Sequence, residues 1–162
     1  MQTESAAGLQ TLLALLIGFQ GLLMLVDELV FHRQRGLDRF ERWGHVADTS
    51  LFFLALLVPA LFPPARPYTL IYIGLAVASA LIITKDEAIH TKSCSAIEHW
   101  CHALLFILHG AILTSTYMLW QLAPAAPILA LMPPVIFCWG LYQHLYWNVY
   151  ARHYLGSKAS HQ

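Results

Sequence analysis

Five apolar runs constrain the fold of this 162-residue chain more than any other feature of its sequence. An α-helix needs about 20 apolar residues to cross a hydrocarbon core about 30 Å thick. Hydrophobic residues make up 58% of the chain and charged residues only 11%, whereas about a quarter of a soluble domain is charged. We therefore predict an all-α membrane bundle of about five transmembrane helices. The runs cover residues 9–30, 46–61, 68–83, 100–122 and 127–150.

The second and third runs are shorter than a full span, so we expect their helices to continue into neighbouring polar residues. The second helix would extend back through His45, and the third would extend forward through Lys85, Asp86 and Glu87. We expect one transmembrane domain over residues 1–155 and a flexible C-terminal tail over residues 156–162. Because no Lys or Arg precedes the first run, we do not expect that run to be a cleaved signal peptide.

Basic residues predict the orientation of the bundle. All lysines and arginines except Arg66 fall on the side that holds the first and third connections and the C-terminal tail. The positive-inside rule makes that side cytoplasmic and puts the N-terminus outside. We therefore predict a multi-pass protein of the cell inner (plasma) membrane with a cytoplasmic C-terminus.

Acidic and histidine side chains gather at the helix ends that this topology brings to the cytoplasmic side. Each helix contributes a polar pair three or four residues apart, and such pairs share one helix face. Lipid penalises ionisable groups, so we expect these faces to point into the bundle. The pairs are Glu28/His32, His45/Asp48, Glu87/His90, Glu98/His102 and His144/Asn148.

This mixture of carboxylate and imidazole predicts a metal site, because it suits iron or zinc, whereas carboxylate alone suits magnesium or calcium. Glu-x-x-His with carboxylates from neighbouring helices holds two metals in di-iron bundles. Glu87-Ala-Ile-His90 has that spacing once, without the duplication of the ferritin-like proteins. Asp48 and Asp86 could be ligands or could orient a histidine ligand. The candidate metal ligands are Glu28, His32, His45, Asp48, Asp86, Glu87, His90, Glu98, His102 and His144.

Some of the polar residues have simpler interpretations. Asp27 is one residue round the helix from Glu28, and we expect it to face lipid headgroups. Asp38 and Glu41 are expected to pair with arginines of the first connection. His45 could be a loop residue, and His144 lies among aromatic residues that are typical of a membrane interface.

His109 lies seven residues beyond His102, on the same stripe of the fourth helix and about 10 Å deeper in the membrane. It could be a ligand or a polar lining residue.

The favoured function is a membrane metalloenzyme with a two-iron site that oxidises a lipid or another apolar substrate from the bilayer. An electron-donor protein would be its partner. Zinc is the less favoured metal and would make the protein a membrane lipid hydrolase. The absence of net charge gives no sign of nucleic-acid binding.

Two other functions stay open. Ionisable groups inside a bundle also mark ion or proton pathways, although only Gln20, Thr114, Ser115 and Thr116 would extend such a path away from the cluster. Haem held by His144 and another histidine would leave the carboxylates unexplained. Gly8, Gly18 and Gly21 could permit close helix contact in a homo-oligomer.

Overall fold

The computed structural model describes residues 2–86 and 94–151, which form helices and contain no β-strand. Five stretches are long and apolar enough to cross a membrane, as the sequence predicted. They are α1 (Gln2–Val26) with η1 (Asp27–His32) and α2 (Arg33–Arg35), α3 (Arg39–Leu61), α4 (Arg66–Ile82) with η2 (Ile83–Asp86), α6 (Ala96–Leu122), and α7 (Pro127–Gln143) with η3 (His144–Tyr150). The segments η1 and η3 are π-helical, and η2 is a 3₁₀ turn.

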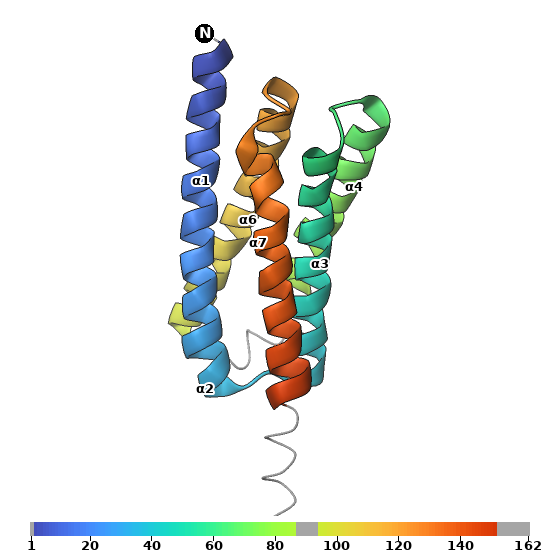
Figure 1. The fold of residues 1–162 in the computed structure, drawn as a ribbon. Coiled ribbons are helices and arrows are strands. Elements are labelled where there is room, and N and C mark those ends of the chain that lie inside the picture. The colour runs from blue at the N-terminus through green and yellow to red at the C-terminus, as the bar shows by residue number, and fades with distance from the viewer. Residues whose placement is uncertain (1, 87–93, 152–162) are drawn as a thin grey trace, which may run out of the picture.

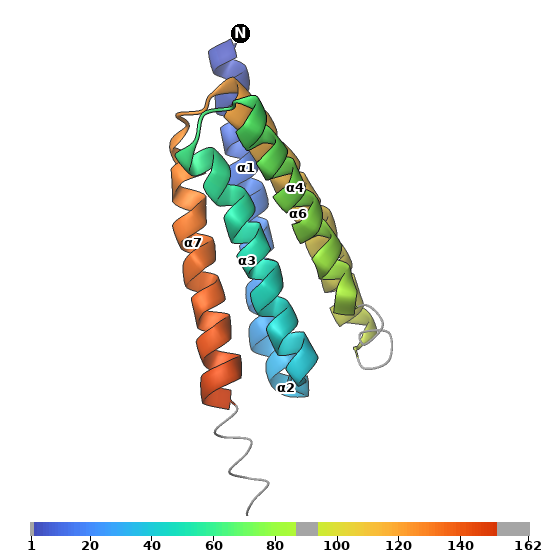
Figure 2. The same ribbon diagram turned by 90° about the vertical axis from the view of Figure 1, so that its right-hand side faces the viewer.

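The helices run alternately up and down and form an elongated bundle (Figures 1 and 2). Helix α3 packs against α7 and α4, and α1 packs against α6. The span of α6 is the most buried of the five, while those of α1 and α4 are the least buried. Helix α6 is therefore well placed to carry a buried site, with α1 as its main partner.

The turn between α2 and α3 depends on Gly36, the one residue of the described chain with a positive φ, 77°. Glycine adopts this conformation without a steric penalty and commonly ends helices. The Gly36 amide donates to the carbonyl of His32 at 2.7 Å, which closes the end of the first span. Asp38 then caps α3 in a full capping box with Glu41.

An apolar core lies in the half of the bundle away from this turn. Leu13, Leu56, Ile112 and Trp120 are among its fully buried members. The Trp120 indole Nε1 donates to the carbonyl of Phe62 at 2.8 Å, so its polar end is paired inside the bundle.

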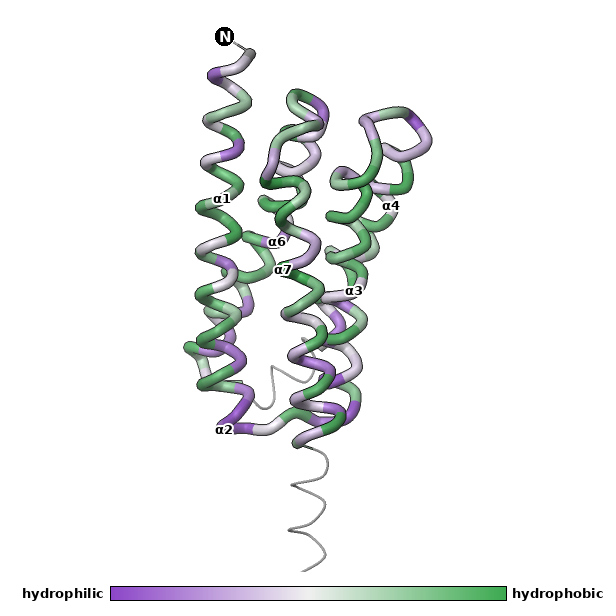
Figure 3. Tube along the Cα trace, in the orientation of Figure 1, coloured by the Kyte–Doolittle hydropathy of each residue, from purple (hydrophilic) through white to green (hydrophobic). Residues whose placement is uncertain are grey.

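Large apolar side chains also cover the outside of the bundle, including Leu15, Leu70, Ile107 and Leu131, each more than 60% exposed. Such a surface suits lipid rather than water. Figure 3 shows that hydrophilic residues concentrate where α2 joins α3 and where α7 ends. One end of the bundle is thus polar, while the side of the membrane that it faces stays a prediction.

The short second and third runs extend as the sequence predicted. Helix α3 begins at Arg39, so His45 lies inside a helix and is not a loop residue. The third span continues through Lys85 to Asp86 in η2. Glu87, His90 and the expected tail from residue 156 lie outside the described residues.

Candidate metal centre

A π-helical segment sets the first half of the site. In η1, residues five apart lie roughly one turn from each other, because the backbone hydrogen bonds run from i to i+5. Asp27 and Glu28 therefore both face His32. The His32 Nε2 atom is 3.3 Å from Asp27 Oδ2, and the His32 Nδ1 atom is 3.5 Å from Glu28 Oε2. All three side chains are buried.

The first two turns of α6 supply the second half of the site. Glu98 and His102 are buried and four residues apart, so they share the face of α6 that points into the bundle. Ser95 caps the helix, since its Oγ accepts a hydrogen bond from the Glu98 amide at 3.3 Å. The Glu98 carboxylate lies toward Arg35, with 3.4 Å between Oε1 and the arginine Nε.

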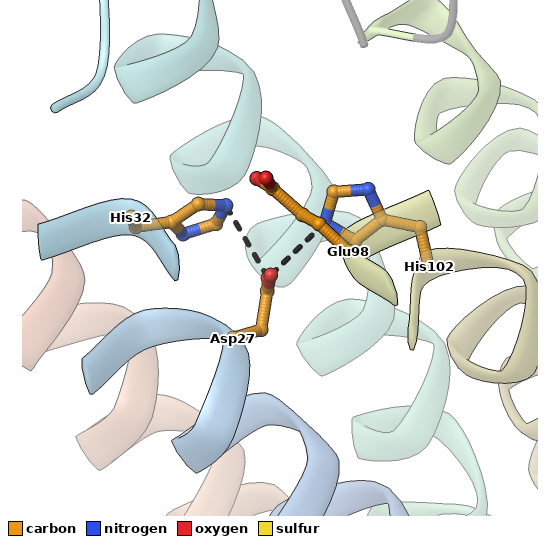
Figure 4. A group of neighbouring side chains, drawn as sticks. All are labelled: Asp27, His32, Glu98 and His102. Carbon is orange, nitrogen blue, oxygen red and sulfur yellow. Dashed lines mark hydrogen bonds and ion pairs between the residues drawn. The ribbon is translucent and has the colours of Figure 1, made fainter. Parts of the chain in front are cut away.

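The two halves meet in a group of four buried side chains, drawn in Figure 4. One ligand atom from each of Asp27, His32, Glu98 and His102 lies within 4.8 Å of all the others. Asp27 lies between the two histidines, and its Oδ1 is 3.0 Å from His102 Nε2. Two imidazoles and two carboxylates, gathered and shielded in this way, could hold a metal ion.

Glu28 lies beside this group and not in it. Its Oε1 accepts hydrogen bonds from the Trp147 indole N–H and, at 3.5 Å, from the Tyr142 hydroxyl. Its Oε2 faces Nδ1 of His32. A carboxylate on the far nitrogen of a metal-binding histidine fixes the tautomer and the ring orientation, and Glu28 has the geometry for that role.

Arg35 is a cation at the rim of the site. It forms an ion pair with Glu41, 2.8 Å from Nη1 to Oε1, and approaches Glu98 through Nε. The expected pairing of Glu41 with an arginine is thus confirmed. Asp38 is used differently, because its carboxylate accepts the Glu41 amide at 2.8 Å and caps α3.

A polar cavity of about 100 Å³ adjoins the four-residue group. Asp27, His102, His45 and Asp48 all line it, so the α3 pair predicted from sequence reaches the same interior space. The His45 ring lies 4.9 Å from the His32 ring, centroid to centroid. His45 and Asp48 therefore neighbour the group, although their ligand atoms are not among the four.

His109 lines the same cavity one level deeper, on the α6 stripe that it shares with His102. Its Nε2 is 2.9 Å from the hydroxyl of Ser79, and its ring packs 4.4 Å from that of Phe52. His109 thus serves as a lining residue and stands apart from the four gathered ligand atoms.

Of the remaining predicted ligands, His144 lies apart from the four grouped side chains. Its ring packs 5.7 Å from the ring of Trp43, and it lines a shallow cavity between α3 and α7. Asp86 ends η2, where only its backbone is described, and Glu87 and His90 fall outside the described residues.

The expectation that Asp27 faces lipid headgroups is wrong. An α-helical period would turn Asp27 about 140° away from His32, five residues later. The π-helical turn brings it inward instead, to 6% exposure. The sequence signal that could have revealed this is the adjacent acidic pair itself, since two carboxylates in one apolar run are costly if either faces lipid.

The three cysteines, Cys94, Cys101 and Cys138, are free. Burial and the neighbouring Glu98 carboxylate raise the pKa of the Cys94 thiol to about 12. A thiol with this pKa stays protonated at neutral pH and is a poor nucleophile.

Comparison of the chain with protein-family models, with curated proteins and with solved structures found no match.

Proposed function

We propose that this protein is an integral membrane metalloenzyme that binds iron at the group of Asp27, His32, Glu98 and His102 and oxidises an apolar substrate. The observation that carries the proposal is the convergence of four buried ligand atoms from two helices within 4.8 Å. Metal-bound nitrogen and oxygen atoms in a tetrahedral site lie about 3.4 Å apart, given bonds of 2.0–2.1 Å. Small side-chain movements would therefore bring these four atoms onto one ion.

The charges around the group also support a bound cation. Asp27, Glu28 and Glu98 are each less than 10% exposed. Buried carboxylates are costly unless cations compensate them. Arg35 approaches Glu98 but also forms an ion pair with Glu41. A divalent ion between the histidines and carboxylates would add positive charge beside that of Arg35.

A second iron would lie on the cavity side of the group. His45 and Asp48 line the cavity that Asp27 and His102 also line. Carboxylate-rich sites shared by several helices hold two irons in other helical bundles. Glu87 and His90 remain proposed ligands of this second ion, on their spacing alone.

The proposed reaction is a hydroxylation that uses dioxygen. One oxygen atom would enter a C–H bond of the substrate, and the other would be reduced to water. Two electrons and two protons are needed, and we propose an electron-donor protein on the polar side of the bundle as the electron source. Iron supplies the oxygen chemistry, while Glu28 would hold His32 in position through Nδ1.

Metal analysis of the full-length protein, purified in detergent from the membrane of its host, tests this proposal. We expect two irons per chain and oxygen consumption when the chemically reduced protein is mixed with air-saturated buffer. Stoichiometric zinc would favour the proposal of a lipid hydrolase over that of an oxidase. A protein that neither retains nor takes up iron or zinc would refute both.

Proton transport is a second candidate, favoured by the hydrogen bond between His109 and Ser79 and by buried Thr116 deeper in α6. These groups extend the polar interior beyond the metal group. Proton flux into vesicles containing the protein, abolished by His109→Phe while iron binding persists, would favour transport over oxidation.

A further inference from the structure

A large apolar cavity adjoins the polar cavity of the metal centre. Its volume is about 630 Å³, within the range of small-molecule pockets. Its walls come mainly from α1 and α7, and Phe52 and Leu56 of α3 and Ile112 of α6 also line it. Leu22 and Leu25 on α1 and Leu131 on α7 line it while being well exposed on the outer surface. The cavity is therefore open to the side, where the bundle meets lipid.

The two cavities share part of their walls. Gln20, Met24, Phe52, Ile136 and Trp139 line both the apolar cavity and the polar cavity. The two cavities thus adjoin at these side chains, near Asp27 and His102, which line the polar cavity.

Two residues of this shared wall each carry a buried polar atom without a partner. The Gln20 side chain is 6% exposed, and its Oε1 has no hydrogen-bond partner within residues 2–86 and 94–151. The indole Nε1 of Trp139 is likewise buried without a partner in that part of the chain. Unpaired buried polar atoms are rare in folded proteins, because each costs about 1–3 kcal/mol. An acceptor and a donor on residues of one shared wall would suit a ligand that carries both complements.

The chemistry of these atoms selects the ligand class. A hydroxyl group can donate to the Gln20 oxygen and accept from the Trp139 N–H, whereas an alkane can do neither. The side chains that line the apolar cavity include no charged group. A charged group inside this apolar cavity would be buried without a counterion, so the part of the ligand that it holds is neutral.

We propose that this cavity binds a neutral molecule with one hydroxyl group on a long apolar tail. The hydroxyl group lies at the junction with Gln20 and Trp139, and the tail extends between α1 and α7 toward the bilayer. That this molecule is the substrate or product of the enzyme rests on the proposed oxidation, but its binding does not.

Glycines on α1 leave room for the tail. Gly18 and Gly21 line the cavity, and a Cβ atom added at either would meet nothing within 4 Å. Without side chains at these two positions, the α1 wall of the cavity is open. A large side chain at Gly18 would fill the space that the tail needs.

Binding of radiolabelled dodecan-1-ol, dodecane and dodecanoate to the full-length protein in lipid nanodiscs tests the proposal. We expect saturable binding of one dodecanol per chain, about tenfold tighter than dodecane, because a paired hydroxyl replaces unpaired buried atoms. Dodecanoate should bind more weakly than the alcohol. Equal affinity for dodecanol and dodecane, or no saturable binding, would overturn the proposal.

Matched variants test whether Gln20 and Trp139 at the junction are responsible for dodecanol binding. Gln20→Leu and Trp139→Phe should each weaken dodecanol binding about tenfold, while Gln121→Leu and Trp43→Phe, both at exposed positions, should not. Unchanged affinity in both junction variants would mean that water alone pairs these atoms, and it would overturn the proposal.

The tail pocket has its own pair of variants. Gly18→Phe should abolish saturable binding, whereas Gly8→Phe, outside the cavity on the same helix, should not. If Gly18→Phe binds dodecanol like the wild type, the cavity assignment is wrong.

Measurement in EDTA-treated and iron-loaded protein separates this inference from the proposed function. Alcohol binding in a protein that takes up no metal would sustain the ligand site and refute the metalloenzyme. Iron binding without alcohol binding would refute the ligand site and leave the metal centre standing.

Discussion

Asp27 joins the two halves of the metal centre, since its two carboxylate oxygens lie 3.3 Å from His32 and 3.0 Å from His102. The spacing of Glu28 and His32 drew attention to the right turn of helix. It does not predict that the neighbouring acid also points inward, because an α-helical period of 3.6 residues turns Asp27 away from His32, whereas η1 is π-helical. Residue types were thus predictable from the sequence, while their assignment within one turn was not.

His102 and His99 form a matched pair on α6, three residues apart. His102→Ala removes one of the four grouped ligands, so we expect iron affinity to fall by more than about a hundredfold, beyond the loss typical of outer groups. His99→Ala should bind iron like the wild type, because His99 is outside the group. Titration of the detergent-purified variants with ferrous iron measures both affinities. An equal loss of affinity in the two variants would contradict the placing of His102 in the metal group.

Glu28 should act through His32 and not as one of the four ligands. Glu28→Gln keeps the side-chain shape but weakens the contact with His32 Nδ1. We expect iron affinity to fall by about 10–100-fold, the range for groups that orient a ligand. A complete loss of iron would instead make Glu28 a direct ligand, as the sequence alone suggested.

At the scale of elements, the apolar runs predicted each span, and the polar extensions of the second and third spans were expected from the thickness of the membrane. The S-x-x-E spacing of Ser95 and Glu98 is typical of a capping box, and Ser95 does cap α6. Only half of that capping box forms among the described residues, since the Glu98 carboxylate lies toward Arg35. Local sequence rules cannot show when a tertiary partner will take over a capping residue.

The contact between α3 and α7 includes a buried hydrogen bond from Thr49 Oγ1 to Gln143 Oε1, 2.8 Å long. Thr49→Val removes the hydroxyl donor, so Gln143 Oε1 loses this hydrogen bond. Hydrogen bonds between membrane helices average about 0.6 kcal/mol and reach about 1.7 kcal/mol, so we expect the free energy of unfolding to fall by about 1 kcal/mol.

Reversible unfolding in mixed detergent micelles measures this loss. Thr114→Val is the matched control, because the Thr114 hydroxyl is exposed and bonds within its own helix, to the Gly110 carbonyl. A larger effect at Thr114 than at Thr49 would contradict the assigned packing of α3 on α7.

For the whole molecule, the sequence predicted that polar groups would collect at one end of a five-helix bundle. The depth of each polar residue in the membrane follows from its position along its span, because successive helices alternate in direction. Which helices become neighbours does not follow from depth. His144 shares the polar end with His32, yet it packs against Trp43 and not in the metal group. Tertiary packing of α7 on α3 decides that outcome.

The orientation of the bundle is a further prediction at this scale. Among the described residues, every lysine and arginine except Arg66 lies at the polar end, so we expect that end and the C-terminus in the cytoplasm. A green fluorescent protein fused to the C-terminus should fluoresce, and alkaline phosphatase fused there should be inactive. The opposite pair of results would reverse the orientation and move the metal centre to the outer side.

The iron content of two aspartate variants tests the metal centre most directly. Asp27→Asn removes the carboxylate between the two histidines, whereas Asp38→Asn keeps a good helix cap outside the group. We predict that the wild type and Asp38→Asn bind iron stoichiometrically after reconstitution of the purified full-length protein, and that Asp27→Asn loses at least one iron per chain. Equal iron in both variants, or no iron in the wild type, would contradict a metal site at Asp27, His32, Glu98 and His102.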